Sequence, residues 1–242
     1  MGHSWRGVVG FVKPTYRTGS LEETIRILPE GIGVIPLYVG VRSGTEGEFS
    51  QALTIAEQRV DELAKIGVDL IHIGGAPPPM LLGYDADHKL ADRLSQKHGI
   101  PVIISTTGLV RALKTMNIRK ICGITYFKEE LNSKFAKYLT DAGFQVLAME
   151  GMELPFNFKA VGGIPATEVY SFAKKKFLQM GGADCIYLLG SGWSVLPIIE
   201  KLEQDLQTTV IAGEQVTIWD ILRSLRVRDP IKGYGKLLSN NL

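Results

Sequence analysis

The sequence is poor in cysteine, in net charge and in long apolar runs, and each of these absences excludes a class of protein. Its 242 residues contain two cysteines, Cys122 and Cys185, too few for a disulfide framework and without the spacing of a zinc site. Lys and Arg number 27 against 25 Asp and Glu, so a broad basic surface for nucleic acid is not expected. No apolar run reaches the roughly 20 residues of a membrane helix, and the first residues lack the apolar core of a signal peptide. We therefore expect a cytoplasmic globular protein with no nucleic-acid or membrane partner.

Short apolar segments rich in β-branched residues alternate along the chain with longer segments of helical periodicity. Most of the short segments are hydrophobic throughout, which is typical of strands covered on both faces of a parallel sheet. The expected strands are Gly7–Val12, Ile32–Val39, Val68–Ile73, Pro101–Ser105, Lys120–Thr125, Phe144–Met149, Asp184–Leu189 and Thr209–Ala212. The expected helices are Ser20–Leu28, Glu46–Ile66, Asp87–Lys97, Gly108–Met116, Glu129–Ala142, Ala166–Met180, Leu196–Leu206 and Glu214–Leu225. A capping box of Ser20 and Glu23 opens the first helix. The alternation predicts a doubly wound α/β fold, in which ligands bind beyond the carboxyl ends of the strands.

The chain contains an internal repeat that ends in glycine. Residues 67–75 (GVDLIHIGG) align with residues 182–190 (GADCIYLLG), and the first Gly, the Asp, an Ile and the last Gly coincide. A weaker parallel joins residues 101–104 and 209–212, although any two strand–helix units look alike. We expect two pseudo-symmetric Rossmann-like lobes with mainly parallel sheets and the active site in the cleft between them. The predicted lobes are residues 1–115 plus 214–242 and residues 116–213.

Two loops in the first half follow expected strands and carry groups that can bind a small anion. The loop with Pro14, Thr15 and Arg17 offers a hydroxyl and a guanidinium to a carboxylate. Gly75 and Ala76 can turn their backbone amides toward an anion before three prolines remove further donors. A helix cap and a plain strand–helix turn are the structural alternatives for these two loops.

Two loops in the second half also follow expected strands. Thr125 and Tyr126 place hydroxyls where they can bind an oxyanion or donate a proton. Gly190 and Ser191 combine exposed amides with a hydroxyl, and Asn157 is a further candidate in a loop. Structural aromatic residues are common at strand ends, so packing is the alternative for the first of these loops. The sequence shows neither G-x-S-x-G nor a phosphate-binding glycine motif.

The run YDADH at residues 84–88 has a faint likeness to a metal-binding cluster. Such a run before an amphipathic segment is more typical of a helix start, and we expect no metal. His72 lies in a buried strand, where it is either a core residue or a group that orients its neighbours.

Several segments along nearly the whole chain are typical of one known family. They are PVIISTT at 101–107 running into Ala112-Leu113, residues 121–125 with 129–132, residues 182–184, residues 215–223 and residues 228–238. On these segments the chain resembles the maleate isomerase and arylmalonate decarboxylase branch of the aspartate/glutamate racemase superfamily. The resemblance implies two pseudo-symmetric α/β lobes and no cofactor or metal. It also implies an enediolate or carbanion stabilised by loop amides and hydroxyls, with cysteines at two strand ends to move protons.

The chain departs from that family at the residues that move protons. Both family cysteine positions fall on glycine here, at Gly75 and Gly190. The strand-end tyrosine motif reads TYF at 125–127, and the hydroxyl-bearing loop of the decarboxylases reads GAP at 75–77. Cys185 cannot substitute, because its odd offset from Gly190 along the strand points it to the opposite face. A reaction that uses two thiols is therefore not expected.

These observations favour a cofactor-independent, decarboxylase-like lyase that acts on a small carboxylic acid through an oxyanion or enediolate held by loop amides. Tyr126 and Ser191 are the candidate proton donors, and Arg17 is the candidate anchor for a carboxylate. One alternative is an isomerase or racemase of a small (di)carboxylate that uses acids other than thiols. A second alternative is a catalytically degenerate protein that binds small molecules. The implied partner is a small carboxylate, and a homo-oligomer is an ordinary state for such folds.

Overall fold

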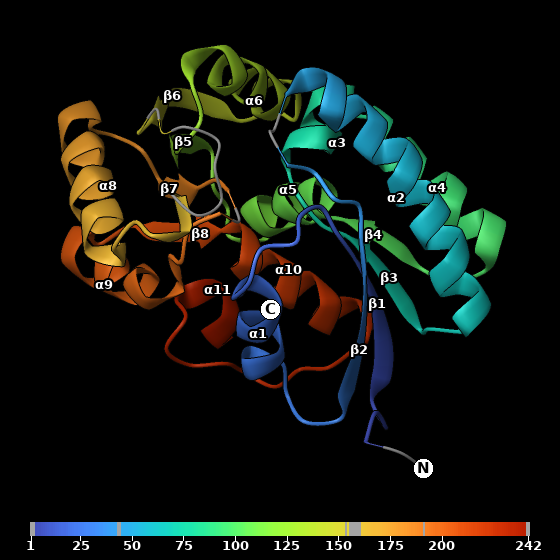
Figure 1. Ribbon diagram of the computed structural model, residues 1–242. Coiled ribbons are helices and arrows are strands. Elements are labelled where there is room, and N and C mark those ends of the chain that lie inside the picture. The colour runs from blue at the N-terminus through green and yellow to red at the C-terminus, as the bar shows by residue number, and fades with distance from the viewer. Residues whose placement is uncertain (1–2, 43–44, 153, 155–160, 191, 241–242) are drawn as a thin grey trace. The chain divides into compact units, whose positions relative to one another are not determined.

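The computed structural model describes residues 3–42, 45–152, 154, 161–190 and 192–240 (Figure 1). In this part of the chain, strands form two four-stranded sheets in which every paired strand is parallel. The predicted α/β fold is confirmed. The first sheet has the order β2-β1-β3-β4, with β1 (Gly7–Lys13), β2 (Ile32–Tyr38), β3 (Leu70–Ile73) and β4 (Val102–Ile104). The second has the order β6-β5-β7-β8, with β5 (Lys120–Thr125), β6 (Gln145–Gly151), β7 (Cys185–Leu188) and β8 (Thr209–Ala212).

Helices connect the strands. The described helices are α1 (Ser20–Ile27), α2 (Glu46–Ile66), α3 (Pro77–Leu82), α4 (Ala86–His98), α5 (Ser105–Thr115), α6 (Glu129–Asp141), α8 (Ala166–Met180), α9 (Leu196–Leu206), α10 (Gly213–Ser224) and α11 (Lys236–Asn240). The cap of α1 differs from the predicted one, because the Gly19 amide donates to the Glu22 carboxylate at 2.9 Å and Ser20 is already helical. Among these helices none combines the length and the apolar character needed to cross a bilayer.

The chain divides into two compact units. The first comprises Met1–Gly108 and Thr217–Asp229, and the second comprises Leu109–Val216 and Pro230–Leu242. The second unit also contains residues 109–115, 214–216 and 230–242, which the expected lobes placed with the first.

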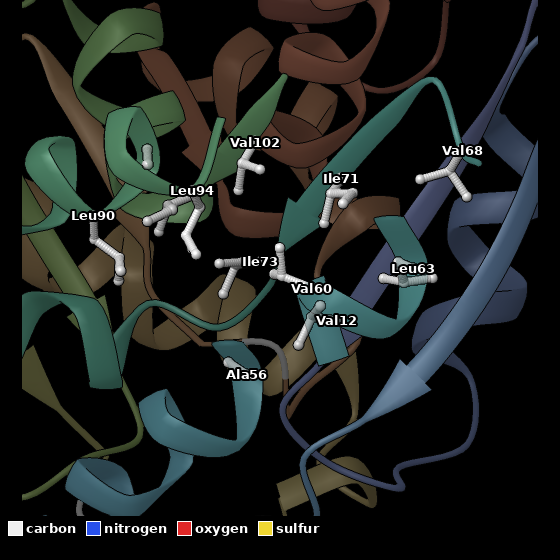
Figure 2. Close-up of a cluster of buried hydrophobic side chains, with 12 residues drawn as sticks. Val12, Ala56, Val60, Leu63, Val68, Ile71, Ile73, Leu90, Leu94 and Val102 are labelled. Carbon is white, nitrogen blue, oxygen red and sulfur yellow. The ribbon is translucent and has the colours of Figure 1, made fainter. Parts of the chain in front are cut away.

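The core of the first unit lies against one face of its sheet (Figure 2). Val12, Ile71 and Ile73 project from β1 and β3 onto Val60 of α2 and Leu94 of α4, and all five are nearly or fully buried. Side chains alternate between the faces of a strand. The residues between these, notably Phe11 and His72, therefore lie on the other face of the sheet.

Matching contacts recur at the start of the repeat in the two units. The Asp69 carboxylate accepts from the amide of Val8 at 2.7 Å, and the Asp184 carboxylate accepts from the amide of Lys120 at 2.9 Å. The Asp69 and Asp184 amides donate in return to the carbonyls of Val8 and Lys120, both at 2.9 Å. These bonds and the shared strand order support the duplication predicted from the two Gly-x-Asp segments.

Candidate active site

Gly190, which follows β7, faces the ring of Tyr126, which follows β5. The φ angle of Gly190 is +122°, a region that favours glycine. A Cβ atom built on this residue would lie 2.3 Å from Cε1 of Tyr126 and 2.8 Å from its Cζ, closer than real Cβ contacts come. The ring of Tyr126 therefore occupies the space that a side chain at position 190 would need.

Packing and a hydrogen bond hold Tyr126 in this place. Its side chain is 3% exposed and meets the Trp193 ring edge-on, with the ring centroids 5.1 Å apart. The Gly192 amide donates to the phenol oxygen at 3.2 Å. An amide that donates to this oxygen stabilises the phenolate that would remain after a proton transfer.

Thr125, which we predicted to bind substrate, makes its hydrogen bonds within the protein. Its hydroxyl donates to Oδ1 of Asn132 at 2.8 Å and accepts from the Phe127 amide at 3.0 Å. The Asn132 side chain in turn donates to the Phe127 carbonyl at 3.1 Å. All of these groups are buried, and their bonds fix the backbone on both sides of Tyr126.

Trp193 carries a buried donor that the sequence did not point to. The residue is 2% exposed, and its indole Nε1 has no hydrogen-bond partner among the described residues. Most buried donors in proteins are paired. A donor in this state beside Tyr126 can serve an acceptor atom of a bound molecule.

The first unit repeats the arrangement of strand end and glycine with different chemistry. Gly75 has φ +89°, and a Cβ atom there would lie 2.9 Å from Cγ of Pro14. Pro14 and Tyr126 hold equivalent positions in the two units. Val12 pairs with Ile73, and Pro14 and Gly75 each follow two residues later. In the same way Ile124 pairs with Leu188, and Tyr126 and Gly190 each follow two residues later. Proline has no proton to give. The paired positions therefore supply one hydroxyl acid, in the second unit only.

The other predicted residues of the first unit lie around Pro14. Its carbonyl accepts from the amides of Gly40 at 3.1 Å and Val41 at 2.8 Å, which fixes the loop. Thr15 and Arg17 are half-buried in that loop. At the other strand end, the amides of Gly75 and Ala76 donate to no acceptor in the described part of the chain. Two further predicted residues, Ser191 and Asn157, lie outside the described residues.

Both cysteines are enclosed in strands. Cys122 in β5 and Cys185 in β7 have no exposed surface. Burial, with a smaller contribution from Glu150, raises the pKa of the Cys122 thiol to about 12. Burial likewise raises the pKa of Cys185 well above its ordinary value. Neither thiol is in a state suited to nucleophilic attack.

The YDADH run has a structural role. Asp87 is fully buried in the first turn of α4 and accepts from the Thr106 hydroxyl at 2.6 Å and from the His88 amide at 2.9 Å. The bond from Thr106 joins α4 to α5. Within the described residues, no cluster of three or more His, Cys, Asp or Glu side chains is placed to hold a metal ion.

Comparison with known proteins decides the family. The sequence matches the family described as arylmalonate decarboxylase over residues 10–238. The chain belongs to this family. Among its relatives, the maleate isomerase of Geobacillus stearothermophilus is 27% identical over 192 residues, covering 78% of this chain and 73% of that protein. The arylmalonate decarboxylase of Bordetella bronchiseptica is 20% identical over 238 residues, covering 89% and 95%.

Solved structures of the same family share the fold. The maleate isomerase Iso of Pseudomonas putida S16 superposes with a TM-score of 0.88 at 19% identity, covering 97% of this chain and 99% of that chain. A crystal structure of arylmalonate decarboxylase gives 0.82 at 17% identity, covering 96% and 99%. A Nocardia farcinica maleate cis-trans isomerase variant, solved with a covalently bound succinylcysteine intermediate, gives 0.88 at 20%, covering 96% and 98%. At these identities the likeness establishes the two-sheet fold of this family, which contains both decarboxylases and isomerases.

Proposed function

We propose that this protein is a cofactor-independent enzyme of the decarboxylating lyase type, acting on a small carboxylic acid, with Tyr126 as its proton donor. The observation that carries the proposal is the phenol of Tyr126 in the side-chain space of Gly190. The family resemblance puts a proton-moving cysteine at that position. In our proposal Tyr126, at the end of the neighbouring strand β5, supplies the proton that Gly190 cannot.

Among the described residues, the acids at the two equivalent strand ends favour decarboxylation over racemisation. Decarboxylation needs one proton, delivered to carbon after carbon dioxide has left, whereas a two-base racemisation needs an acid on each side of the carbon. Tyr126 is one such group, while its counterpart Pro14 has none. Thiol addition of the kind trapped in the Nocardia isomerase is not supported, because Cys122 and Cys185 are both enclosed in strands.

The proposed reaction proceeds through an enediolate. The bond between the α-carbon and the reacting carboxylate breaks, carbon dioxide leaves, and the electron pair stays on an enediolate. The Trp193 indole donates to a developing oxyanion. Tyr126 gives its proton to the α-carbon, and its phenolate, stabilised by the Gly192 amide, regains a proton from water. We further propose that the Gly75 and Ala76 amides, with Thr15 and Arg17, bind a carboxylate group.

An isomerase or racemase with oxygen acids is the second candidate. The maleate isomerase of Geobacillus stearothermophilus shares 27% identity with this chain, against 20% for the Bordetella decarboxylase. That reaction would need an acid–base group in addition to Tyr126. A protein that binds small molecules and has lost its catalytic acids is the third candidate.

The experiment that separates these functions uses a panel of aryl- and alkylmalonates, maleate, and small 2-amino and 2-hydroxy acids in deuterium oxide. We expect carbon dioxide release with deuterium on the α-carbon, and its loss in Tyr126→Phe but not in Tyr170→Phe, whose tyrosine lies in α8. Proton exchange or cis–trans conversion without carbon dioxide would establish the isomerase instead. Ligand-induced stabilisation with no turnover of any compound would leave only the binding protein.

A further inference from the structure

Lys13, the last residue of β1, is a buried cation without a counterion. The residue is 7% exposed, and its ammonium nitrogen lies 5.5 Å from the centre of the Phe11 ring. Across the described residues its side chain meets no carboxylate and no hydrogen-bond acceptor. Its ammonium nitrogen is not among the fully enclosed unpaired atoms of the described residues, so it keeps accessible surface at which a ligand can meet it.

Lys13 lies on the face of the first sheet opposite the core shown in Figure 2. It alternates with Val12, which belongs to the apolar core in Figure 2, and so it lies on the same side as Phe11. On this side the His72 ring lies 5.3 Å from the Phe11 ring, and its Nε2 is 3.4 Å from the hydroxyls of Ser105 and Thr217. The ammonium therefore belongs to a surface of the sheet that already carries polar groups.

Lys13 has two neighbours across the sheet: Tyr38 of β2, with which it pairs directly, and Gly74 on the β3 side, which has no side chain. Val12 pairs with Ile73, which puts Lys13 beside Gly74, and the Gly74 amide donates to the Val12 carbonyl at 2.8 Å. A Cβ atom on Gly74 would lie 3.7 Å from Cε1 of His72, so the missing side chain would have been on this same face. On the β3 side, the strand end beside Lys13 is therefore bare backbone.

The equivalent residue of the second unit shows that the fold does not require an unpaired group here. That residue is Thr125, since Ile124 pairs with Leu188 as Val12 pairs with Ile73. Thr125 is fully buried, and its hydroxyl both donates and accepts within the protein. The unpaired cation is thus particular to the first unit.

We propose that Lys13 binds a carboxylate group of the ligand through an ion pair, and so adds a charged specificity determinant to the proposed carboxylate-processing function, on which this inference rests. A carboxylate would supply the counterion and the hydrogen-bond acceptors that the ammonium lacks. Lys13 is a positioning residue in this account.

The test is calorimetric binding of maleate to wild type, Lys13→Met and Lys13→Arg, with Lys65→Met as the control for loss of an exposed positive charge. Loss of the ion pair predicts about tenfold to a hundredfold weaker maleate binding in Lys13→Met. We expect Lys13→Arg to recover part of that loss and Lys65→Met to bind as wild type does. Equal binding by Lys13→Met, or no maleate binding by wild type, would overturn the inference.

Two further measurements show whether weaker binding by Lys13→Met reflects the loss of a carboxylate ion pair. Without ligand, we expect the melting temperature of Lys13→Met to stay close to that of wild type, because the ammonium has no ion pair or hydrogen bond to lose within the described residues. A marked fall would mean that the ammonium has a structural partner and would contradict the inference. Sulfate that binds wild type as tightly as maleate would show a general anion site rather than a carboxylate site.

Binding and turnover distinguish this inference from the proposed function. If wild type binds maleate through Lys13 but turns over no carboxylic acid, the proposed function fails and the inference stands. If wild type releases carbon dioxide from a malonate while Lys13→Met binds and reacts equally well, the inference fails and the proposed function stands.

Discussion

Tyr126 and Gly190 form a pair in which the ring of one residue fills the space where the other has no side chain. Pro14 and Gly75 make the corresponding pair in the first unit, so the packing relationship is repeated while the chemistry is not. Only the tyrosine can donate a proton. At the scale of residues, the proposed reaction depends on this difference.

Substitution of Gly190 tests the packing of Tyr126. We expect Gly190→Ala to destabilise the protein by a few kcal/mol, because the new methyl group meets the tyrosine ring and φ is positive. Urea unfolding measures the change. In a Tyr126→Ala background the clash is absent, so a double-mutant cycle should give a coupling of about 1–3 kcal/mol.

Gly143→Ala is the matched control for backbone strain alone. Gly143 has φ +95°, and a Cβ atom there would meet nothing within 4 Å. We expect this variant to lose about 1 kcal/mol, less than Gly190→Ala. Additive effects of Gly190→Ala and Tyr126→Ala would show that the ring does not occupy the space beside Gly190.

At the scale of elements, apolar runs with clear ends were predictable from the sequence. The strands Lys120–Thr125 and Thr209–Ala212 and the helix Ala166–Met180 occur at their predicted bounds. Helix α3 was missed, because its three opening prolines suggested a stiff loop. The amides in the first turn of a helix have no acceptor within the helix, so proline, which lacks the amide hydrogen, is compatible with this position. Helix α11 has only five residues, too few for a periodic signal.

One buried carboxyl group ties three elements of the second unit together. Glu203 of α9 accepts from the amide of Val210 in β8 at 3.1 Å and from the amide of Lys236 in α11 at 2.9 Å. Burial raises the pKa of Glu203 above its ordinary value of 4.5, although both amide bonds act in the opposite direction. In the folded protein this group therefore holds its proton to a higher pH than in the unfolded chain.

The raised pKa of Glu203 predicts how stability depends on pH. Its contribution is fully present below the unfolded pKa and is lost as pH rises through the folded pKa. We expect the free energy of unfolding of wild type to fall as pH increases from about 4.5, and Glu203→Gln to lack that part of the fall.

Denaturant unfolding at a series of pH values measures this effect, with the exposed Glu130→Gln as control. A wild-type profile parallel to that of Glu203→Gln would contradict the assignment. The comparison concerns the slope with pH, because glutamine also removes one of the two acceptors.

At the scale of the whole molecule, the two units have the same strand order, and the duplication was predictable from two nine-residue segments. The strand-end glycines at 75 and 190 followed from that repeat, and Tyr126 followed from its place after β5. The contact between Tyr126 and Gly190 joins residues 64 positions apart, and no local pattern encodes it. Burial of the Lys13 and Trp193 side chains also depends on tertiary packing, so the sequence did not indicate their unpaired donors.

The cysteines provide a measure of global opening. Cys122 and Cys185 have no exposed surface and raised pKa values, so we expect almost no reaction with a thiol reagent in the native protein near pH 8. Two thiols should react in denaturant. Labelling under native conditions should occur only through large openings, at rates that follow global stability. Rapid stoichiometric labelling of either thiol in the native state would contradict the enclosed strands.

The central claim is that a tyrosine, and not a thiol, moves the proton. The most direct test is kcat/KM for carbon dioxide release from the best substrate of the malonate panel, measured for wild type, Tyr126→Phe and the thiol-free Cys122→Ala/Cys185→Ala variant. We predict that the thiol-free variant, once shown to be folded, keeps activity close to that of wild type, and that Tyr126→Phe loses about a hundredfold to ten-thousandfold. Full activity in Tyr126→Phe together with loss of activity in the folded thiol-free protein would contradict the account.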